Sequence, residues 1–412
     1  HRSWQFMGSC KTIKQQALGL YAQYWKSACG ISSFVLCFQY RICCRMGWTM
    51  QAMEGKRDTM SKIRELEIED RPLDKHAMEQ AKKQWNSVAK PLGSLGKLEE
   101  LIITLAGIQG TEHVSLKKKE VLVYCADNGI VEEGVSQSDS SVTSMVAASM
   151  AQGRANINIM ASSVGAGVTP IDIGMKDTVE HSGLLQYKVM KGTQNFAKNP
   201  AMTPEQCMQA IRTGIMLTGR KAQEGVNILA IGEMGIGNTT TSSAVASVLL
   251  KQPVAKMTGR GAGLTGSGLE HKKQVIEEAI SKYDPDPQDA FEVLCKVGGL
   301  DIAAMAGTCI GGMVYGLSVV LDGFISAVAA LAAVRMVPSC RPYLLPSHVS
   351  REPAAAAVLE AMDMHPVLHA DMCLGEGTGA VLLFPLLDTA LAEYQSAHTF
   401  GEIELKPYEE LK

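Results

Sequence analysis

The segment Leu374–Ala380 reads Leu-Gly-Glu-Gly-Thr-Gly-Ala and places one carboxylate, that of Glu376, between two glycines. Glycine lets the backbone approach a ligand closely and adopt φ values that other residues rarely take. A carboxylate held in such a turn can take a proton from a bound substrate and act as a general base. An isolated Gly-Glu-Gly is more often an ordinary acidic loop, so the interpretation depends on a substrate-binding turn elsewhere in the chain.

A second glycine-rich turn, at residues 232–241, has the sequence context of an anion site. The apolar segment Val226–Ile231 runs directly into Gly-Glu-Met-Gly-Ile-Gly-Asn-Thr-Thr-Thr, and a helical pattern follows. A helix N-terminus offers unpaired N–H groups and a positive dipole end, which favour a bound anion. The Gly-Lys-Ser/Thr ending of a nucleoside-triphosphate loop is missing. We therefore predict an anion-binding turn of another kind, with a purely structural turn as the alternative.

Gly261–Gly266 matches the G-x-G-x-x-G pattern of dinucleotide-binding proteins. The preceding residues include Pro253 and do not read as a strand, so a glycine-lined ligand wall is the better interpretation. Lys272 follows shortly and could offer its charge to a phosphate or carboxylate. Alone, it would be read as an ordinary solvated helix lysine.

Two histidines four residues apart, His365 and His369, raise the question of a metal site. Pro366 disfavours a helix at His365, so the two rings are not expected on one helical face. We predict no metal ligand here.

The whole-chain composition is that of a globular protein: 412 residues, 46% hydrophobic and 20% charged. A net charge of −3 gives no electrostatic case for binding nucleic acid or a membrane surface. No apolar run approaches the ~20 residues that span a bilayer. The cysteines of the body are scattered and form no C-x-x-C pair, which indicates reduced thiols in a cytoplasmic protein: Cys125, Cys207, Cys295, Cys309, Cys340 and Cys373.

Residues 1–53 differ from the rest, because they contain no Asp or Glu, three of the four tryptophans and five of the eleven cysteines. After Glu54 the sequence becomes charged and helix-forming. A targeting peptide would explain the missing acids but not the Trp and Cys content, and an additional module is a further alternative. We interpret residues 1–59 as a non-native or disordered extension outside the fold.

From Glu120 the sequence alternates between short apolar runs and small-residue helical stretches. The predicted strands are Val121–Ala126, Val168–Ile173, Val226–Ile231, Val319–Phe324 and Tyr343–Leu345. The predicted helices between them include Val142–Met160, Thr240–Leu250 and Ile325–Met336. Such alternation indicates an α/β fold with a parallel sheet covered on both faces. Ligands of these folds bind beyond the carboxyl ends of the strands, so we expect a rim of Asp127, Asp172, Glu233 and Asp322.

Over about residues 60–405 the chain resembles the nicotinate-nucleotide–dimethylbenzimidazole phosphoribosyltransferase family, which activates the lower base of cobalamin. The resemblance rests on ordered matches at residues 90–96, 126–129, 133–136, 232–240, 298–301, 322–324, 347–348 and 374–380. It implies a Rossmann-like parallel sheet with helices on both faces and a smaller helical domain built from both chain ends. We accordingly assign residues 111–384 to a large catalytic domain, and residues 60–110 with 385–412 to the small one.

The resemblance also implies the chemistry: transfer of 5-phosphoribose from nicotinate mononucleotide to a benzimidazole-type base by a cytoplasmic homodimer. The family's catalytic base matches Glu376, and the residues matching Glu233 and Lys272 also lie in the site. We predict a substrate site without metal or other cofactor that is formed by Glu233, Gly235, Ile236, Gly237, Asn238, Thr239, Gly261, Gly263, Lys272, Ser350, Leu374 and Gly375.

One segment departs from the family pattern. Some members carry an aromatic residue, a proline and a glutamine around the base, whereas residues 136–141 read Ser-Gln-Ser-Asp-Ser-Ser. We predict that Ser138 and Ser140 line the base pocket, which leaves open a benzimidazole, a purine or a phenol as acceptor. A non-catalytic nucleotide- or base-binding homologue and a nicotinamide-dinucleotide oxidoreductase are the competing hypotheses.

Overall fold

The computed structural model describes residues 66–261 and 263–408, so the extension predicted for residues 1–59 lies outside the described residues. The strands are β1 Lys119–Ala126, β2 Ala166–Gly174, β3 Leu185–Gln186, β4 Ile228–Met234, β5 Ser318–Leu321 and β6 Leu344–Pro346. The α-helices are α3 Lys75–Ser87, α4 Lys97–Gln109, α5 Ser141–Ala151, α6 Asn156–Ser163, α7 Pro204–Gln223, α8 Asn238–Leu250, α9 Val254–Met257, α10 Gly266–Tyr283, α11 Ala290–Val297, α12 Leu300–Tyr315, α13 Phe324–Met336, α14 Ala355–Glu360, α15 Thr378–Val381 and α16 Leu383–Ser396. Two 3₁₀ helices, η1 Gly129–Glu133 and η2 Pro338–Tyr343, complete the set.

The six strands form one sheet in the order β3-β2-β1-β4-β5-β6, and every neighbouring pair is parallel. This is the strand order of the Rossmann fold, and the predicted α/β class is confirmed. The order reverses between β1 and β4, where the connections leave toward opposite sides. The crevice beyond the carboxyl ends of these two strands is therefore the expected ligand site.

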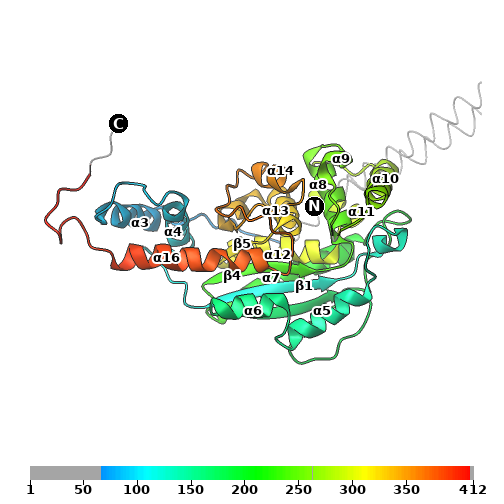
Figure 1. Ribbon diagram of the computed structural model, residues 1–412, viewed down its shortest axis with the longest axis horizontal. Coiled ribbons are helices and arrows are strands. Elements are labelled where there is room, and N and C mark those ends of the chain that lie inside the picture. The colour runs from blue at the N-terminus through cyan, green and yellow to red at the C-terminus, as the bar shows by residue number, and fades with distance from the viewer. Residues whose placement is uncertain (1–65, 262, 409–412) are drawn as a thin grey trace, which may run out of the picture. The chain divides into compact units, whose positions relative to one another are not determined.

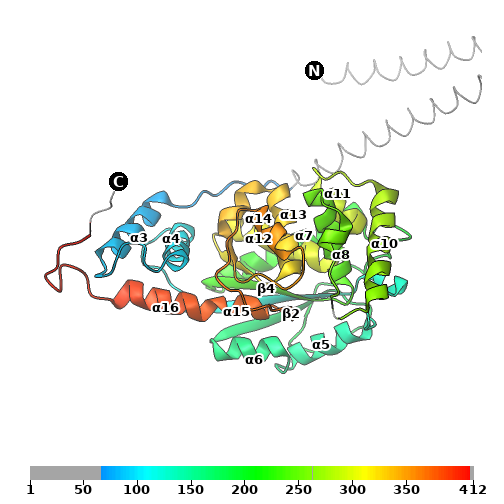
Figure 2. The same cartoon turned by 45° about the horizontal axis from the view of Figure 1, so that its top comes forward.

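Each face of the sheet packs against its own hydrophobic core. Along β1, Leu122 and Tyr124 belong to one core, whereas Val121 and Val123 belong to the other, as the period of two in a strand requires. Figures 1 and 2 show α5 and α6 on one face of the sheet and α8, α12 and α13 on the other. Both faces are covered, which explains why the strands read as unbroken apolar runs.

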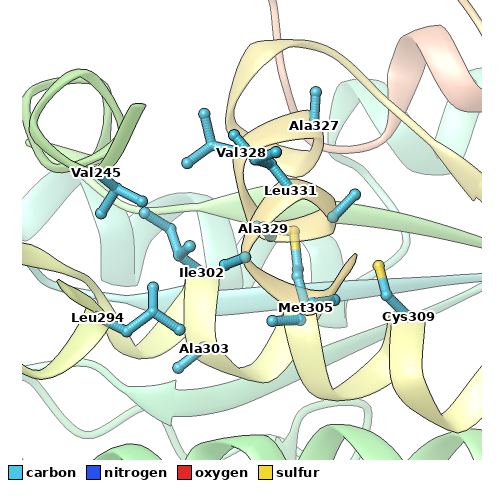
Figure 3. Packing of buried hydrophobic residues seen from close by; sticks show 14 of the residues in the cluster. Val245, Leu294, Ile302, Ala303, Met305, Cys309, Ala327, Val328, Ala329 and Leu331 are labelled. Atoms are coloured by element: carbon cyan, nitrogen blue, oxygen red, sulfur yellow. The ribbon is translucent and has the colours of Figure 1, made fainter. Parts of the chain in front are cut away.

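Small residues allow the helices on the second face to pack closely. Figure 3 shows alanines, Met305 and Cys309 of α12 against the alanines and Leu331 of α13. A Cβ added at Gly214 of α7 would lie 2.0 Å from the carbonyl oxygen of Ala304 in α12. The two helix backbones are therefore in direct contact at this glycine.

Helices from both ends of the described chain pack together. The rings of Trp85 in α3 and Tyr394 in α16 lie 5.0 Å apart, and Nε2 of Gln84 donates to the Tyr394 carbonyl at 2.9 Å. The backbone N–H of Ala89 donates to the carbonyl of His398 at 2.9 Å, which joins the segments that follow α3 and α16. Figure 1 shows α3 and α4 beside α16. The domain boundaries at residues 110 and 385 stay a prediction.

Three predicted elements need correction. The strand predicted for Val226–Ile231 is β4, which begins at Ile228 and ends at Met234. The helix predicted for Val142–Met160 is two helices, α5 and α6, because Gly153 adopts a left-handed φ of 75° between them. The strand predicted to end at Phe324 ends at Leu321, and Phe324 instead begins α13. Within the part of the chain that the structure describes, no helix is both long and apolar enough to cross a membrane.

Candidate active site

A cavity of about 220 Å³ opens beyond the carboxyl ends of β4 and β5. Its wall combines the turn after β4, the end of β5 and the segment before α15, which are far apart in sequence. The lining includes Glu233, Gly235, Ile236, Asn238, Thr239, Gly261, Asp322, His348, Ser350, Leu374, Gly375 and Glu376. A smaller neighbouring cavity of about 70 Å³ shares the glycine-rich turn and is completed by residues that include Ser136, Gln137, Gly237 and Arg260.

The glycine-rich segment leads from β4 into α8, but Gly232–Met234, which were predicted to belong to the turn, form the end of β4. Gly237, the residue before the helix, has a φ of 93°, and a Cβ there would lie 2.6 Å from the Val131 side chain. The backbone N–H of Ile236 donates to Oγ1 of Thr143 at 3.2 Å, which fixes the turn against α5. Asn238 and Thr239 at the N-terminus of α8 border both cavities, and the positive end of the helix dipole there favours a bound anion.

Two buried carboxylates, Glu233 and Asp301, share the side-chain amide of Asn238. Its Nδ2 donates to Oε2 of Glu233 and lies 3.1 Å from Oδ2 of Asp301. Burial raises the pKa of Glu233 to about 8, and repulsion from Asp301 adds to this effect. Burial likewise raises the pKa of Asp301 to about 6. Near neutral pH, Glu233 therefore carries a proton and can donate a hydrogen bond to a ligand.

This carboxylate pair should make the stability of the unliganded protein depend on pH. Since the folded protein holds protons that the unfolded chain releases above about pH 4.5, the free energy of unfolding should fall as pH rises from about 5 to about 8. The slope approaches about 1.4 kcal/mol per pH unit for each proton released. Glu233→Gln, which resembles the protonated acid, should flatten the profile. Urea unfolding at several pH values measures the slope.

The matched control is Glu277→Gln, which changes an exposed glutamate of α10 and should leave the slope at its wild-type value. A Glu233→Gln profile as steep as that of the wild type would assign the titration to other groups.

Glu376 occupies an unusual backbone position at the cavity wall. Its φ is 63°, and its neighbours Gly375 and Gly377 have φ values of 86° and 91°. A left-handed conformation costs a non-glycine residue about 1–2 kcal/mol, so the surroundings must hold it in place. The side chain is only 6% exposed. The general base predicted from the sequence thus lies in the cavity wall and not in bulk solvent.

The carboxylate of Glu376 rests on the N-terminus of α6. The N–H of Ile157 donates to Oε2 at 3.1 Å, and Nδ2 of Asn156 lies 3.3 Å from Oε1. The backbone N–H of Glu376 itself donates to the carbonyl of Glu233 at 3.2 Å. These contacts join the turn to α6 on one side and to the end of β4 on the other.

Lys272 of α10 is fully buried next to the start of α8. Its Nζ donates to Oγ1 of Thr239 at 2.9 Å and to the carbonyl of Gly259 at 3.2 Å. Burial lowers its pKa to about 8, so the side chain stays mostly protonated at pH 7. Two of the three ammonium donors are used by these acceptors, and Lys272 itself lines neither cavity.

The chain as a whole is similar to known proteins. A family model described as phosphoribosyltransferase matches residues 71–404. The nicotinate-nucleotide–dimethylbenzimidazole phosphoribosyltransferase of Ruminiclostridium cellulolyticum is 46% identical over 355 residues, which are 86% of this chain and 99% of the relative. The protein of the same name from Acetivibrio thermocellus is 44% identical over 337 residues, 82% of this chain and 96% of the relative. The chain belongs to the nicotinate-nucleotide–dimethylbenzimidazole phosphoribosyltransferase family.

Solved structures of this family share the fold. A crystal structure of CobT from Thermus thermophilus superposes with a TM-score of 0.77 at 38% sequence identity. The match covers 81% of this chain and all of the solved one. The resemblance inferred from the motifs is therefore confirmed, and so is membership of a phosphoribosyltransferase family.

Most of the predicted site residues meet at the two cavities of this family member. Four do not line either cavity: Gly263, Lys272, Ser138 and Ser140. Gly263 is nearby, since its carbonyl accepts a hydrogen bond of 2.5 Å from Nε2 of Gln137. In the segment predicted to line the base pocket, the side chains of Ser136 and Gln137 border the smaller cavity.

Several site residues were not among those predicted for the family site. His348 lines the larger cavity, Asp301 shares Asn238 with Glu233, and Asn156 contacts Glu376. Two of them could have been suspected from the sequence, because Asp301 and His348 fall within segments that match the family. Asn156 carries no such signal, since its contact is 220 residues away along the chain.

Proposed function

We propose that this chain transfers 5-phosphoribose from nicotinate mononucleotide to 5,6-dimethylbenzimidazole or a related lower base, with Glu376 as the general base. The products are α-ribazole 5′-phosphate and nicotinate, in cobalamin biosynthesis. Assignment of the reaction follows from the family, whereas the roles of individual residues are our proposal.

The chemistry requires one proton acceptor. The bond between C1′ and the pyridinium nitrogen breaks, its electron pair stays on that nitrogen, and nicotinate leaves without needing a general acid. An azole nitrogen forms the new bond to C1′, and the other azole nitrogen loses its proton. A single positioned carboxylate meets this need, and nearby negative charge also stabilises an oxocarbenium-like C1′.

The observation that carries this proposal is the placement of Glu376 in one wall with the glycine-rich turn. The start of α8 after this turn places the positive end of a helix dipole at the cavity for the phosphate, and Glu376 can accept the one proton that the reaction releases. Holding both substrates in line could contribute about 7–11 kcal/mol before any proton moves. No step in this scheme uses a metal or redox cofactor.

A product assay tests the proposal. The purified chain is incubated with nicotinate mononucleotide and a panel of 5,6-dimethylbenzimidazole, benzimidazole, adenine and phenol, and products are quantified by mass spectrometry. We expect equal amounts of nicotinate and ribosylated base phosphate. If only adenine or phenol supported turnover, the phosphoribosyl transfer would be confirmed with a different acceptor. If no nicotinate were released with any base, the chain would be a non-catalytic homologue.

Replacement of Lys272 by methionine should weaken mononucleotide binding. Methionine keeps the buried apolar stem but removes the cation that adjoins Thr239. Hydrogen bonds to charged groups contribute about 1.5–3 kcal/mol, so we expect the KM for the mononucleotide to rise at least about tenfold. Steady-state kinetics with saturating base measure this change.

Lys273→Met is the matched control, because Lys273 is the next residue of α10 and its Nζ lies 2.7 Å from Oε1 of Glu270. It should leave KM unchanged. An unchanged KM in Lys272→Met as well would make Lys272 a structural residue only.

We further propose that the enzyme works in the cytoplasm as a homodimer. The five buried cysteines of the described chain are free thiols, which suits a reducing compartment. Light scattering at micromolar concentration tests the dimer, and a monomer mass would contradict it.

A further inference from the structure

Asp322 lies at the carboxyl end of β5 and is only 6% exposed. Its carboxylate accepts three backbone hydrogen bonds from the turn that follows Glu376. Oδ2 accepts from the N–H of Gly377 at 3.0 Å. Oδ1 accepts from Gly379 at 2.7 Å and from Ala380 at 3.2 Å. Both oxygens of Asp322 are thus directed at the backbone of this turn, although the residue also borders the cavity.

The turn needs such an anchor, because three successive residues, Gly375–Gly377, are left-handed. On its other side the turn presses against β4, since a Cβ added at Gly232 would lie 2.4 Å from the carbonyl carbon of Glu376. The turn is therefore held between the carboxylate of Asp322 on one side and the backbone of β4 on the other. A non-glycine residue keeps a left-handed conformation only where its surroundings determine it.

His348 completes the support below the turn. A Cβ added at Gly379 would lie 2.0 Å from Cε1 of His348 and 2.8 Å from Oδ1 of Asp322, so both side chains touch this glycine. Oγ of Ser347 lies 3.0 Å from Nδ1 of His348 and donates to the carbonyl of Leu321 at 2.6 Å. Burial raises the pKa of Asp322, and this effect is opposed by the charge of His348 and by the three N–H donors. These neighbours leave the carboxylate no role as a free base.

We propose that Asp322 is a positioning residue of the transfer reaction: by holding the backbone of Gly377–Ala380, it fixes the direction in which Glu376 presents its carboxylate. This inference rests on the proposed role of Glu376. Both carboxylate oxygens of Asp322 are occupied by N–H groups of the turn, so its loss should lower kcat and leave substrate binding nearly intact.

The test is a double-mutant cycle of Asp322→Asn and Glu376→Gln in the full chain. Asparagine keeps one acceptor oxygen but places an NH₂ donor against an N–H donor of the turn. We expect kcat to fall about 10–100-fold in Asp322→Asn, with the KM for nicotinate mononucleotide within about twofold of wild type. In the Glu376→Gln background the same change should alter kcat less than about twofold, because the residue through which it acts is gone.

Asp172→Asn is the matched control. Asp172 is also buried at the end of a strand, accepts from the N–H of Met175 at 2.9 Å and lies 3.2 Å from Nζ of Lys188, but lines neither cavity. It should lower stability without lowering the kcat of the folded protein. Hydrogen exchange adds a readout independent of turnover: residues 374–382 should exchange faster in Asp322→Asn and not in Asp172→Asn.

Each other outcome overturns the inference. An equal loss of kcat in both backgrounds would mean that Asp322 acts independently of Glu376, and a raised KM with normal kcat would make it a substrate contact. If hydrogen exchange at residues 374–382 were unchanged in Asp322→Asn, Asp322 would not hold this turn in place. If the wild-type chain releases no nicotinate, the proposed function fails together with the inference. If it turns over normally and the cycle is additive, the inference fails alone.

Discussion

Replacing Glu376 by glutamine should lower turnover about 10²–10⁴-fold, the usual contribution of a positioned general base. The amide oxygen of glutamine can still accept the hydrogen bond from the N–H of Ile157, so the turn should keep its place on α6. What disappears is the capacity to take the azole proton. Release of nicotinate under saturating substrates measures the effect, and the KM for the mononucleotide should change little.

Glu360→Gln, an exposed glutamate at the end of α14, is the control for the Glu376 substitution and should turn over normally. A rate near that of wild type in Glu376→Gln would refute the assignment of the base. The phosphoribosyl transfer itself would then need a proton acceptor other than Glu376, and Glu233 would not serve near neutral pH because it carries a proton there.

Replacing Gly232 by alanine should have the second-largest effect, about a 10²-fold loss of kcat. The added Cβ would lie 2.4 Å from both the carbonyl carbon of Glu376 and the nitrogen of Gly377, a distance that real Cβ atoms do not adopt. Because β4 is central in the sheet, the turn must move, and a displacement of about 1 Å can cost 10²-fold in rate. Urea unfolding should also register about 1–3 kcal/mol of overpacking.

Gly401→Ala is the control for this substitution, since a Cβ there meets no atom within 4 Å and both rate and stability should be unchanged. If Gly232→Ala kept the wild-type kcat, the turn would be shown to tolerate displacement, and the strained placement of Glu376 would lose its importance for catalysis.

The sequence predicts the sheet well because its strands are short, buried and apolar throughout. β1 and α8 begin and end within two residues of the predicted bounds. Asp127 and Asp322 directly follow β1 and β5, whereas Asp172 and Glu233 lie within the last residues of β2 and β4. Of the expected rim, Glu233 and Asp322 line the larger cavity, whereas Asp127 and Asp172 line neither cavity. Asp172, also at a strand end, instead accepts a hydrogen bond from the N–H of Met175. The position of a carboxylate along its strand does not predict whether it lines a cavity or binds the backbone, because the conformation of the following loop determines its partners.

Contacts between distant segments could not be predicted from patterns. The contact between Asn156 and Glu376 needs α5 and α6 to be separate helices, and the periodicity of residues 142–160 gave no sign of the break except Gly153. The lining of the base pocket could not be predicted either. Ser136 and Gln137 border the smaller cavity because of the conformation of their loop, which the composition of the segment does not reveal. The assignments of Ser138 and Ser140 and the domain boundaries stay predictions.

The pairing of α3 and α4 with α16 has a consequence for biosynthesis on the ribosome. α4 ends at Gln109 and α16 begins at Leu383, so at about 5–20 residues per second the partner helix emerges roughly 15–50 s later. During that interval apolar side chains such as Trp85 and Leu105 lack part of their final covering. The nascent chain is then exposed to aggregation, and we expect its yield in cells to depend on chaperones that shield emerging polypeptides.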